Sequence, residues 1–546
     1  MSEIFTPLDA FLYWEEQAPN QIFLKQPING QYVTYTYAEA GKEIRKIASA
    51  LKSYNLPEKS HIALLSKNCA HWCMADIAIM MCGYVSIPIY PTLNATSINQ
   101  ILVHSEAKAI IIGKLDDFSV QKPGIPEMPI ISVKLYNEDE GDSWEDLIEY
   151  HQPLQNINKQ QPDDLHTIIY TSGTTGTPKG VMHTSGNLMV SADTLTTLFA
   201  LPNNLRLFSY LPLAHVAERV LINAGVRLGG VISFAESLET FASDLEKTQP
   251  QIFFAVPRIW TKFREKILES LPQKKLDFLL GIPVLNSFIK KKLKKKLGLS
   301  EAVFICSAAA PIASSMVEWY RKLGIIIYQG YGMTEDCCVS HFNTNTDDKI
   351  GTVGKTLYNV KARLSDVGEI CIKNECLMKG YYKEPEITAS VFDSEGYLKT
   401  GDIGEFDHDG FLTITGRVKD QFKTDKGKYI SPSYIELTLS KNTDIEQICV
   451  VGTGIPQPIA LITLSELGKL KSKEDLSSSL IEGVNTMNPS LEKHEKIEKV
   501  VIMKEDWNVD NGLTTPTMKV KRNSIEKIHL QFYKSWFEMD DKVIFE

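Results

Sequence analysis

Short apolar runs alternate with longer amphipathic stretches along most of the chain. The runs are rich in Ile, Val, Leu, Phe and Ala and have the length of buried strands. They lie at 61–66, 107–112, 167–171, 231–235, 251–256 and 302–308. Strands that are separated by helices need crossover connections, so the pattern predicts an α/β fold with parallel sheets.

The pattern changes near Gly416. Lysine-rich loops follow, together with short apolar runs such as 447–451 and 459–464. We therefore predict a large N-terminal domain of packed sheets and helices, residues 1–417, and a small mobile α+β domain, residues 418–546. The polar stretch 151–164 is expected to be a surface connection.

The chain has 546 residues, a length that suggests about 3–4 domains or subdomains. Its net charge of -9 argues against general nucleic-acid binding, which requires a basic surface. The first ten residues do not resemble a signal peptide, and no apolar run approaches the ~18–20 residues of a spanning helix. These features favour a cytoplasmic protein.

The nine cysteines, an odd number, are typical of reduced thiols rather than of a disulfide framework. Cys69, His71, Cys73 and Cys82 match no paired metal-binding spacing, and 75–83 has the composition of a buried helix. No zinc site is predicted here.

A loop after the apolar run 167–171 has the chemistry of a phosphate-binding site. Its glycines allow close backbone approach, its hydroxyls donate hydrogen bonds, and Lys179 adds a positive charge. Pro178 stands before this lysine, where a Walker loop has glycine. The residues expected to contact a nucleotide are Thr171, Ser172, Gly173, Thr174, Thr175, Gly176 and Lys179.

Further motifs follow this loop in a characteristic order, at 211–219, 329–335, 416–420 and 513–522. Together they resemble the adenylate-forming superfamily of acyl-CoA synthetases, luciferases and peptide-synthetase adenylation domains. The resemblance covers nearly the whole chain. The amino-acid sequences of 211–219 and 422–432 are most similar to those of long-chain fatty acyl-CoA synthetases.

The resemblance implies roles around the reacting groups. His215 would lie beside the carboxylate and the nucleotide, and Thr334 would contact the α-phosphate. Glu335 would hold Mg²⁺, a hard cation that takes oxygen ligands. Tyr331 would cover the adenine, and Ala309 belongs to a small-residue segment that would line the adenine and acyl pockets.

The resemblance implies further residues that would bind the ribose of the nucleotide, and two glycines that would lie beside the nucleotide. Asp402 matches an aspartate that accepts hydrogen bonds from both ribose hydroxyls. Arg417 matches an arginine that reaches the same sugar. Gly330 and Gly332 complete the residues assigned to the nucleotide.

The motif at 513–522 carries the lysine that the resemblance assigns to adenylation. Lys519 aligns best with it. Lys521 is the alternative, because Met518 stands where the family usually has glycine.

Three residues are implied for a second step. Lys419 falls at the position where the C-terminal domain would rotate. Gly427 and Lys428 would approach the channel that holds the pantetheine of CoA.

The implied activity is that of an ATP-dependent fatty acid–CoA ligase. A long-chain acid and ATP would give acyl-AMP and pyrophosphate, and CoA would then give acyl-CoA and AMP. The implied cofactors are ATP, Mg²⁺ and CoA. One alternative is an enzyme that stops at the adenylate or passes the acyl group to a carrier protein, and another is a non-catalytic member of the same fold.

One segment also suggests contact with a membrane. The largely apolar stretch 276–289 precedes a lysine cluster. The cluster consists of Lys290, Lys291, Lys292, Lys294, Lys295 and Lys296. Such a segment suits peripheral binding to anionic lipid at the inner face of a membrane. The alternative is a core-packed helix followed by a solvated one.

Overall fold

The computed structural model of the protein describes residues 5–171, 178–515 and 518–546. Its largest sheet has eight strands in the order β19-β9-β8-β4-β3-β5-β6-β7. Parallel pairing of β3 with both β4 and β5 matches the predicted crossover units. The strands are β3 (His61–Leu65), β4 (Val85–Ile89), β5 (Ala109–Ile112), β6 (Ile130–Ser132), β7 (Asp142–Ser143), β8 (Leu165–Thr171), β9 (Lys179–Thr184) and β19 (Gly380–Tyr381).

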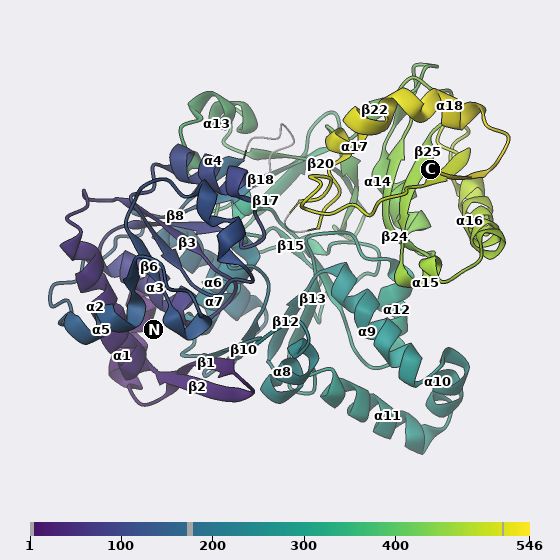
Figure 1. Cartoon of the computed structure of the whole chain (residues 1–546). Coiled ribbons are helices and arrows are strands. Elements are labelled where there is room, and N and C mark those ends of the chain that lie inside the picture. The colour runs from purple at the N-terminus through teal and green to yellow at the C-terminus, as the bar shows by residue number, and fades with distance from the viewer. Residues whose placement is uncertain (1–4, 172–177, 516–517) are drawn as a thin grey trace.

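A second sheet of five strands, in the order β12-β13-β14-β15-β16, lies between this part and the C-terminal end of the chain (Figure 1). Its strands are β12 (Ile252–Ala255), β13 (Phe304–Ser307), β14 (Tyr328–Tyr331), β15 (His341–Phe342) and β16 (Lys355–Thr356). Two sheets of four strands complete the large part. They contain β10 (Arg206–Ser209), β11 (Val231–Phe234), β1 (Ile22–Ile28) and β2 (Gln31–Thr36), and β17 (Lys361–Leu364), β18 (Glu369–Lys373), β20 (Leu398–Phe406) and β21 (Leu412–Arg417).

Helices cover these sheets. α3 (Ala70–Met81) is buried on all sides, because all its residues except His71 and Asp76 are apolar and the Asp76 carboxylate pairs with Arg219 at 2.9 Å. It includes most of the predicted helix at 75–83 but ends at Met81, and the cysteines around it are buried and free. No group of three potential metal-ligating side chains occurs in the described parts of the chain. The principal helices are α1 (Pro7–Gln17), α2 (Tyr37–Ser53), α3 (Ala70–Met81), α4 (Ala95–Ser105), α5 (Trp144–Tyr150), α6 (Ser185–Leu198), α7 (Val216–Arg227), α8 (Phe241–Thr248), α9 (Pro257–Ser270), α10 (Gln273–Leu280), α11 (Pro283–Lys296), α12 (Ser314–Lys322) and α13 (Pro385–Val391).

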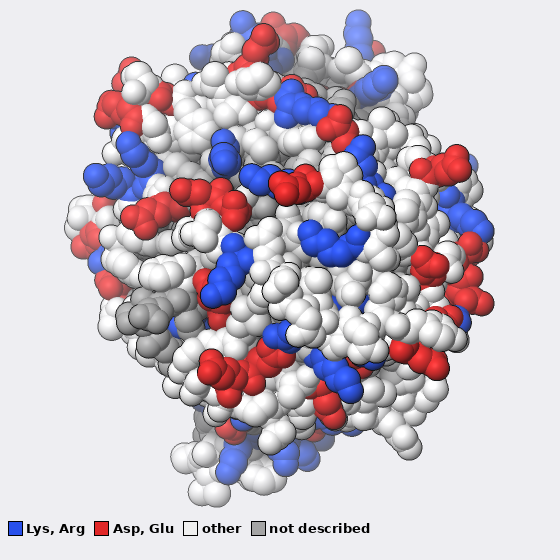
Figure 2. Space-filling view, turned by 90° about the vertical axis from the view of Figure 1, so that its left-hand side faces the viewer, with Lys and Arg blue, Asp and Glu red and all other residues white. Residues whose placement is uncertain are grey.

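The stretch 151–164 contains no helix or strand and is largely exposed, as expected of a surface connection. On the face shown in Figure 2, basic and acidic side chains are interspersed, without a large area of one sign. Among the residues that the structure describes, no helix has the length and apolarity needed to cross a bilayer.

The smaller C-terminal part is an α+β unit, so the predicted division of the fold into a large and a small part is confirmed. Its sheet has the order β24-β25-β26-β27. Alternate strand residues face opposite ways, so Val450 and Ala460 enter one apolar cluster while Cys449 and Leu461 enter another. Its elements are β22 (Phe422–Lys423), β23 (Tyr429–Ile430), α14 (Pro432–Leu439), β24 (Ile445–Val451), β25 (Ile459–Leu464), α15 (Glu466–Lys469), α16 (Lys473–Met487), β26 (Lys499–Ile502), α17 (Arg522–His529), α18 (Tyr533–Glu538) and β27 (Val543–Phe545).

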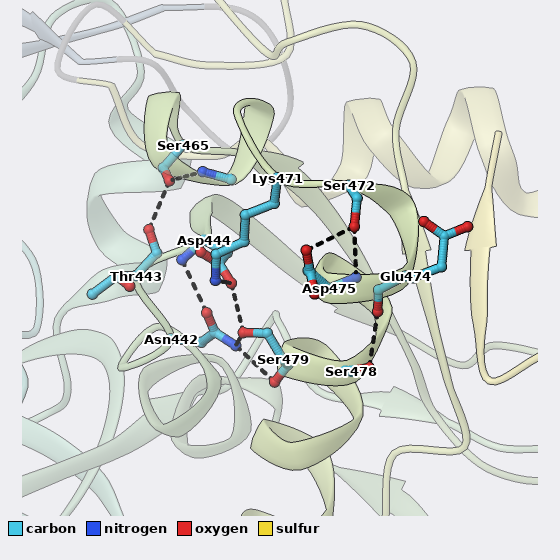
Figure 3. Close-up of polar contacts among 11 residues, drawn as sticks. Asn442, Thr443, Asp444, Ser465, Lys471, Ser472, Glu474, Asp475, Ser478 and Ser479 are labelled. Atoms are coloured by element: carbon cyan, nitrogen blue, oxygen red, sulfur yellow. Dashed lines mark hydrogen bonds and ion pairs between the residues drawn. The ribbon is translucent and has the colours of Figure 1, made fainter.

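A polar network around Asp444 ties the start of β24 to α16 (Figure 3). The buried Asp444 carboxylate accepts hydrogen bonds from the Ser479 hydroxyl at 2.5 Å and the Lys471 ammonium at 2.7 Å. Asn442 accepts from the Asp444 backbone N–H at 2.9 Å and donates to the Ser479 hydroxyl at 3.2 Å. One carboxylate therefore holds three segments of the C-terminal part together.

We predict that Asp444→Ala lowers the local free energy of unfolding by about 2–3 kcal/mol, because it leaves buried donors without their acceptor. Hydrogen exchange in peptides from β24 and α16 measures this loss. Asp475→Ala is the matched control. Asp475 is an exposed acid whose carboxylate accepts the Ser472 hydroxyl at 2.8 Å, while its backbone N–H donates to the same hydroxyl at 3.1 Å. Loss of its side chain should therefore cost about 0.5 kcal/mol or less. Equal effects would show that the Asp444 network does not support the fold.

Candidate active site

The predicted phosphate loop connects two paired strands. β8 and β9 are antiparallel, with Thr171 opposite Lys179. The predicted contacts Ser172, Gly173, Thr174, Thr175 and Gly176 lie outside the described residues. Lys179 is placed at the start of β9, where its Nζ lies 5.2 Å from the centre of the Tyr381 ring.

Tyr381 joins this lysine to the predicted metal ligand. Its hydroxyl donates a hydrogen bond of 2.7 Å to Glu335 Oε1. The Glu335 side chain is buried, and burial raises the pKa of its carboxyl group. Sequence reasoning missed Tyr381, because it reaches the loop only through the pairing of β19 with β9, in which Tyr381 lies opposite Val181. No local pattern around Tyr381 signals this contact.

A tight turn after β14 presents Thr334 and Glu335. Asp336 holds it, since its Oδ1 accepts the backbone N–H groups of Met333 at 2.8 Å and Cys338 at 2.9 Å. Cys337 and Cys338 have φ of 54° and 57°, a left-handed conformation that is strained for a residue with a side chain. Burial raises the pKa of Asp336 to about 7. Asp336 was also missed, although an acid three residues after the start of a turn is typical of capping.

The two predicted glycines of this motif have packing reasons of their own. A Cβ on Gly332 would lie 2.5 Å from backbone atoms of Cys338, and one on Gly330 would lie 2.2 Å from the Phe342 ring. Any larger residue would therefore displace the turn or strand β15.

Asp402 is the centre of a second group. Its Oδ2 accepts the Tyr331 hydroxyl at 2.7 Å, and its Oδ1 accepts the Arg417 Nε–H at 2.7 Å. Asp402 and Arg417 lie opposite each other on β20 and β21. The attraction of Asp402 raises the pKa of Arg417. Each carboxylate oxygen can accept a further hydrogen bond, so the pair leaves room for a diol.

Lys519 lies near both groups and is tied to Thr515 by two hydrogen bonds. The Thr515 N–H donates to Lys519 O at 2.8 Å, and the Lys519 N–H donates to Thr515 Oγ1 at 3.1 Å. The Lys519 side chain retains contact with solvent although protein surrounds it. Desolvation and the positive Arg417 lower its pKa, while Asp402 and Glu335 act in the opposite direction.

The positive charge of Lys519 acts on the side chain of His215. Burial, and then the lysine charge, lower the pKa of His215 to about 4, so the imidazole is neutral at pH 7. Its Nδ1 accepts the backbone N–H of Ala217 at 3.1 Å, at the start of α7. The proton of the neutral ring is therefore on Nε2, which can donate a hydrogen bond.

Two positions where the family resemblance predicts glycine have left-handed backbones here. Ala309 has φ of 69° and Met518 has φ of 63°. Each costs roughly 1 kcal/mol in a residue with a side chain, and the chain keeps the conformation that glycine would favour. Lys521, the alternative lysine, is instead the N-cap residue of α17.

An apolar cavity adjoins this site, with about 20 Å³ of free space, which is room for little more than a water molecule. It reaches the site through Cys338, on which the Lys519 charge acts, and through Ala217, two residues from His215. Its lining consists of Leu195, Phe199, Ala217, Val220, Leu221, Ile252, Phe254, Phe304, Cys337, Cys338 and Phe342.

The residues predicted for the second step lie in turns. Lys419 is exposed in the turn after β21, between Val418, whose N–H donates to Gly401 O at 2.9 Å, and Asp420. Gly427, with φ of 76°, and Lys428 form the turn between β22 and β23. Their predicted roles as pivot and thiol channel stay predictions.

Comparisons with known proteins define the class. Residues 11–382 match the model of the AMP-binding enzyme family, and residues 419–532 match that of the AMP-binding enzyme C-terminal domain. The chain therefore belongs to the AMP-binding enzyme family, which confirms the predicted resemblance.

Two curated relatives are named for fatty acid activation. The chain is 30% identical to long-chain-fatty-acid–CoA ligase FadD15 of Mycobacterium bovis, with 94% of this chain and 93% of that one covered. It is 26% identical to fatty acyl-CoA synthetase A of Dictyostelium discoideum, with 96% and 89% covered.

Solved structures share the fold at lower identity. The adenylation domain of a carboxylate reductase from Mycobacterium chelonae superposes with a TM-score of 0.82 at 20% identity, over 98% of this chain and 91% of that one. The o-succinylbenzoate CoA synthetase of Bacillus subtilis, solved with its acyl-adenylate, gives 0.74 at 20% identity, over 95% and 97%.

We predict that Tyr381→Phe lowers adenylation by about 10–100-fold, because Glu335 loses a hydrogen bond to a charged acceptor that is worth roughly 1.5–3 kcal/mol. ATP–pyrophosphate exchange measures the loss. Tyr382→Phe is the matched control, since the neighbouring hydroxyl donates to the exposed Glu106 at 3.0 Å instead. Similar exchange rates in both variants would show that the Tyr381 hydroxyl does not contribute to adenylation.

Proposed function

We propose that the protein is an ATP-dependent fatty acid–CoA ligase that forms acyl-AMP and then acyl-CoA. The observation that carries this proposal is the convergence of Lys519, Arg417, Asp402 and Glu335 beside a neutral His215 and an apolar cavity. This arrangement offers charge for a nucleotide and an apolar lining that would have to open to admit an acyl chain. The names of the relatives support the same activity.

In the first step a carboxylate oxygen attacks the α-phosphorus of ATP, and the bond to the leaving pyrophosphate breaks. Two anions must approach, so the site has to supply positive charge in advance. Lys519 and Lys179 supply it, and preorganised charge of this kind is worth several kcal/mol. The Nε2–H of His215 orients the carboxylate, and the Thr334 hydroxyl donates to the α-phosphate.

The residues present suit a magnesium ion held together with the nucleotide. Mg²⁺ usually takes one or two carboxylates and completes its shell with phosphate oxygens and water. Glu335 provides one buried carboxylate, of which Oε1 accepts the Tyr381 hydroxyl. When bound, the ion would neutralise charge on the phosphates.

Other residues fix the nucleoside. Asp402 and Arg417 bind the ribose hydroxyls, and the Tyr331 ring covers the adenine. Backbone at Ala309, Gly330 and Gly332 borders the base. The loop residues from Thr171 to Gly176 cradle the outer phosphates.

In the second step the thiol of CoA attacks the acyl carbon and AMP leaves. Gly427 and Lys428 border the thiol channel, and Lys419 is the pivot between domains 1–417 and 418–546. In support, β21 ends at Arg417 and the following strands belong to other sheets. We extend the proposal to the source of the acid: the protein takes it up at the inner face of a membrane, with the basic stretch 290–296 as the contact.

The product mixture tests this function. With ATP, Mg²⁺ and a long-chain acid, CoA should give acyl-CoA and AMP in equal amounts. An acyl group transferred only to an added carrier protein would favour the carrier-dependent alternative. Absence of pyrophosphate release with every acid of a chain-length series would favour the non-catalytic alternative.

We predict that Lys519→Ala lowers adenylation by ~10²–10³-fold, because it removes a charge aimed at the transition state. Conversion of supplied acyl-adenylate to thioester should stay near the wild-type rate. Lys521→Ala, two residues away at the start of α17, is the matched control and should spare both half-reactions. The reverse result would assign adenylation to Lys521.

We predict that Lys419→Pro preserves adenylation and lowers thioester formation from acyl-adenylate by orders of magnitude. A pivot must change φ and ψ, and proline holds φ near about -65°. The two half-reactions are measured separately, with a thermal melt to detect misfolding. A well-folded variant that makes thioester at the normal rate would place the pivot elsewhere.

A further inference from the structure

Helices α10 and α11 form a hairpin that projects from the body of the protein (lower right in Figure 1). Its base is fixed, because Ile289, Leu293 and Leu297 pack against the apolar cluster that contains Leu276. The Trp319 indole donates to Gln273 Oε1 at 2.9 Å. The hairpin is therefore a firmly attached element rather than a loose loop.

The turn end of the hairpin exposes large apolar side chains. Exposed fractions are 68% for Phe278, 82% for Val284 and 61% for Phe288, and Leu285 is also exposed. Val284 and Phe288 are four residues apart on α11 and thus share one side of the helix. Exposed apolar side chains gathered in this way mark an interaction site more often than single ones do.

Lysines follow these side chains on the same helix. The predicted apolar segment 276–289 spans the end of α10 and the first half of α11, and the predicted lysine cluster forms the second half of α11. Within 5–171, 178–515 and 518–546, none of the observed ion pairs involves a lysine of 290–296. The cluster contrasts with the net charge of -9 and with the mixed surface in Figure 2.

Apolar side chains beside unpaired lysines match the chemistry of an anionic bilayer. Aromatic and aliphatic groups enter the boundary between headgroups and acyl chains, and each lysine near the surface adds about 1 kcal/mol. The long lysine stems cover apolar surface while their ammonium groups reach the headgroups. An acidic protein partner would pair with the lysines but would leave the apolar tip unexplained.

The hairpin also lies one layer of the fold away from the apolar cavity. On β12 and β13, Ile252, Phe254 and Phe304 line the cavity. The intervening Phe253 and Ile305 face the other way, into the cluster on which the hairpin rests. One sheet therefore separates the cavity from the base of the hairpin.

We propose that the α10–α11 hairpin inserts Phe278, Val284 and Phe288 into the interface of an anionic bilayer, while the lysines at 290–296 bind the lipid headgroups. This inference rests on the proposed function, because long-chain acids partition into bilayers. The hairpin would hold the enzyme on the surface from which it takes its acid.

Flotation of the full chain with vesicles tests the insertion. Vesicles of a neutral phosphatidylcholine are compared with vesicles that also contain an anionic phospholipid. The wild type should float with the anionic vesicles only. A Phe278→Ser, Val284→Ser, Phe288→Ser variant and a variant with all six lysines changed to Gln should each lower the bound fraction by at least about tenfold.

The matched control changes three apolar side chains of similar exposure elsewhere, Leu238, Val367 and Leu470, to Ser. It should float like the wild type. The proposal is overturned if the wild type does not float, if the control loses as much binding as the tip variant, or if the tip variant floats normally. In the last case the lysines alone would account for any binding.

An activity assay separates this inference from the proposed function. The tip variant should activate a water-soluble medium-chain acid at the wild-type rate and lose activity with a long-chain acid supplied in anionic vesicles. Equal loss with both acids would contradict a role in uptake from the membrane. If the wild type activates neither acid, the proposed function fails, whereas flotation still decides the membrane contact.

Discussion

The site depends on two positively charged side chains, Arg417 and Lys519, that carboxylates hold near one another. Arg417 pairs with Asp402 at 2.7 Å, and Lys519 lies in the field of Arg417, Asp402 and Glu335. Like charges at short range repel, so this arrangement needs the two acids to balance it. A bound polyanion would relieve the remaining repulsion. The same balance of charge explains why the segment that carries Lys519 can lie beside strands β20 and β21.

A further ion pair joins the same two parts of the chain. Arg258 of α9 contacts Glu446 of β24 at 2.8 Å. It is partly exposed, and pairs of this kind contribute at most about 1 kcal/mol. A weak contact of this kind suits a C-terminal part that is proposed to rotate, because it opposes separation little.

Much of the fold and of the site could be predicted from the sequence because both rest on local patterns. Apolar runs fix β3, β5 and β12, and β8 ends at Thr171, the last residue of the apolar run 167–171. Tyr381 could not be predicted, because it reaches Glu335 only through the pairing of β19 with β9. The strain at Ala309 and Met518 was equally hidden, since φ depends on the surrounding structure.

We propose that this balanced charge lets a carboxylate attack ATP without any thiol. Exchange of labelled pyrophosphate into ATP, in the presence of Mg²⁺ and a long-chain acid but without CoA, tests it most directly. We expect exchange that depends on the acid and that falls sharply when Asp402 is changed to Ala, because Arg417 and Lys519 are then unbalanced and the proposed acceptor for the ribose is lost. Exchange that does not require an acid, or that persists unchanged in Asp402→Ala, would contradict it.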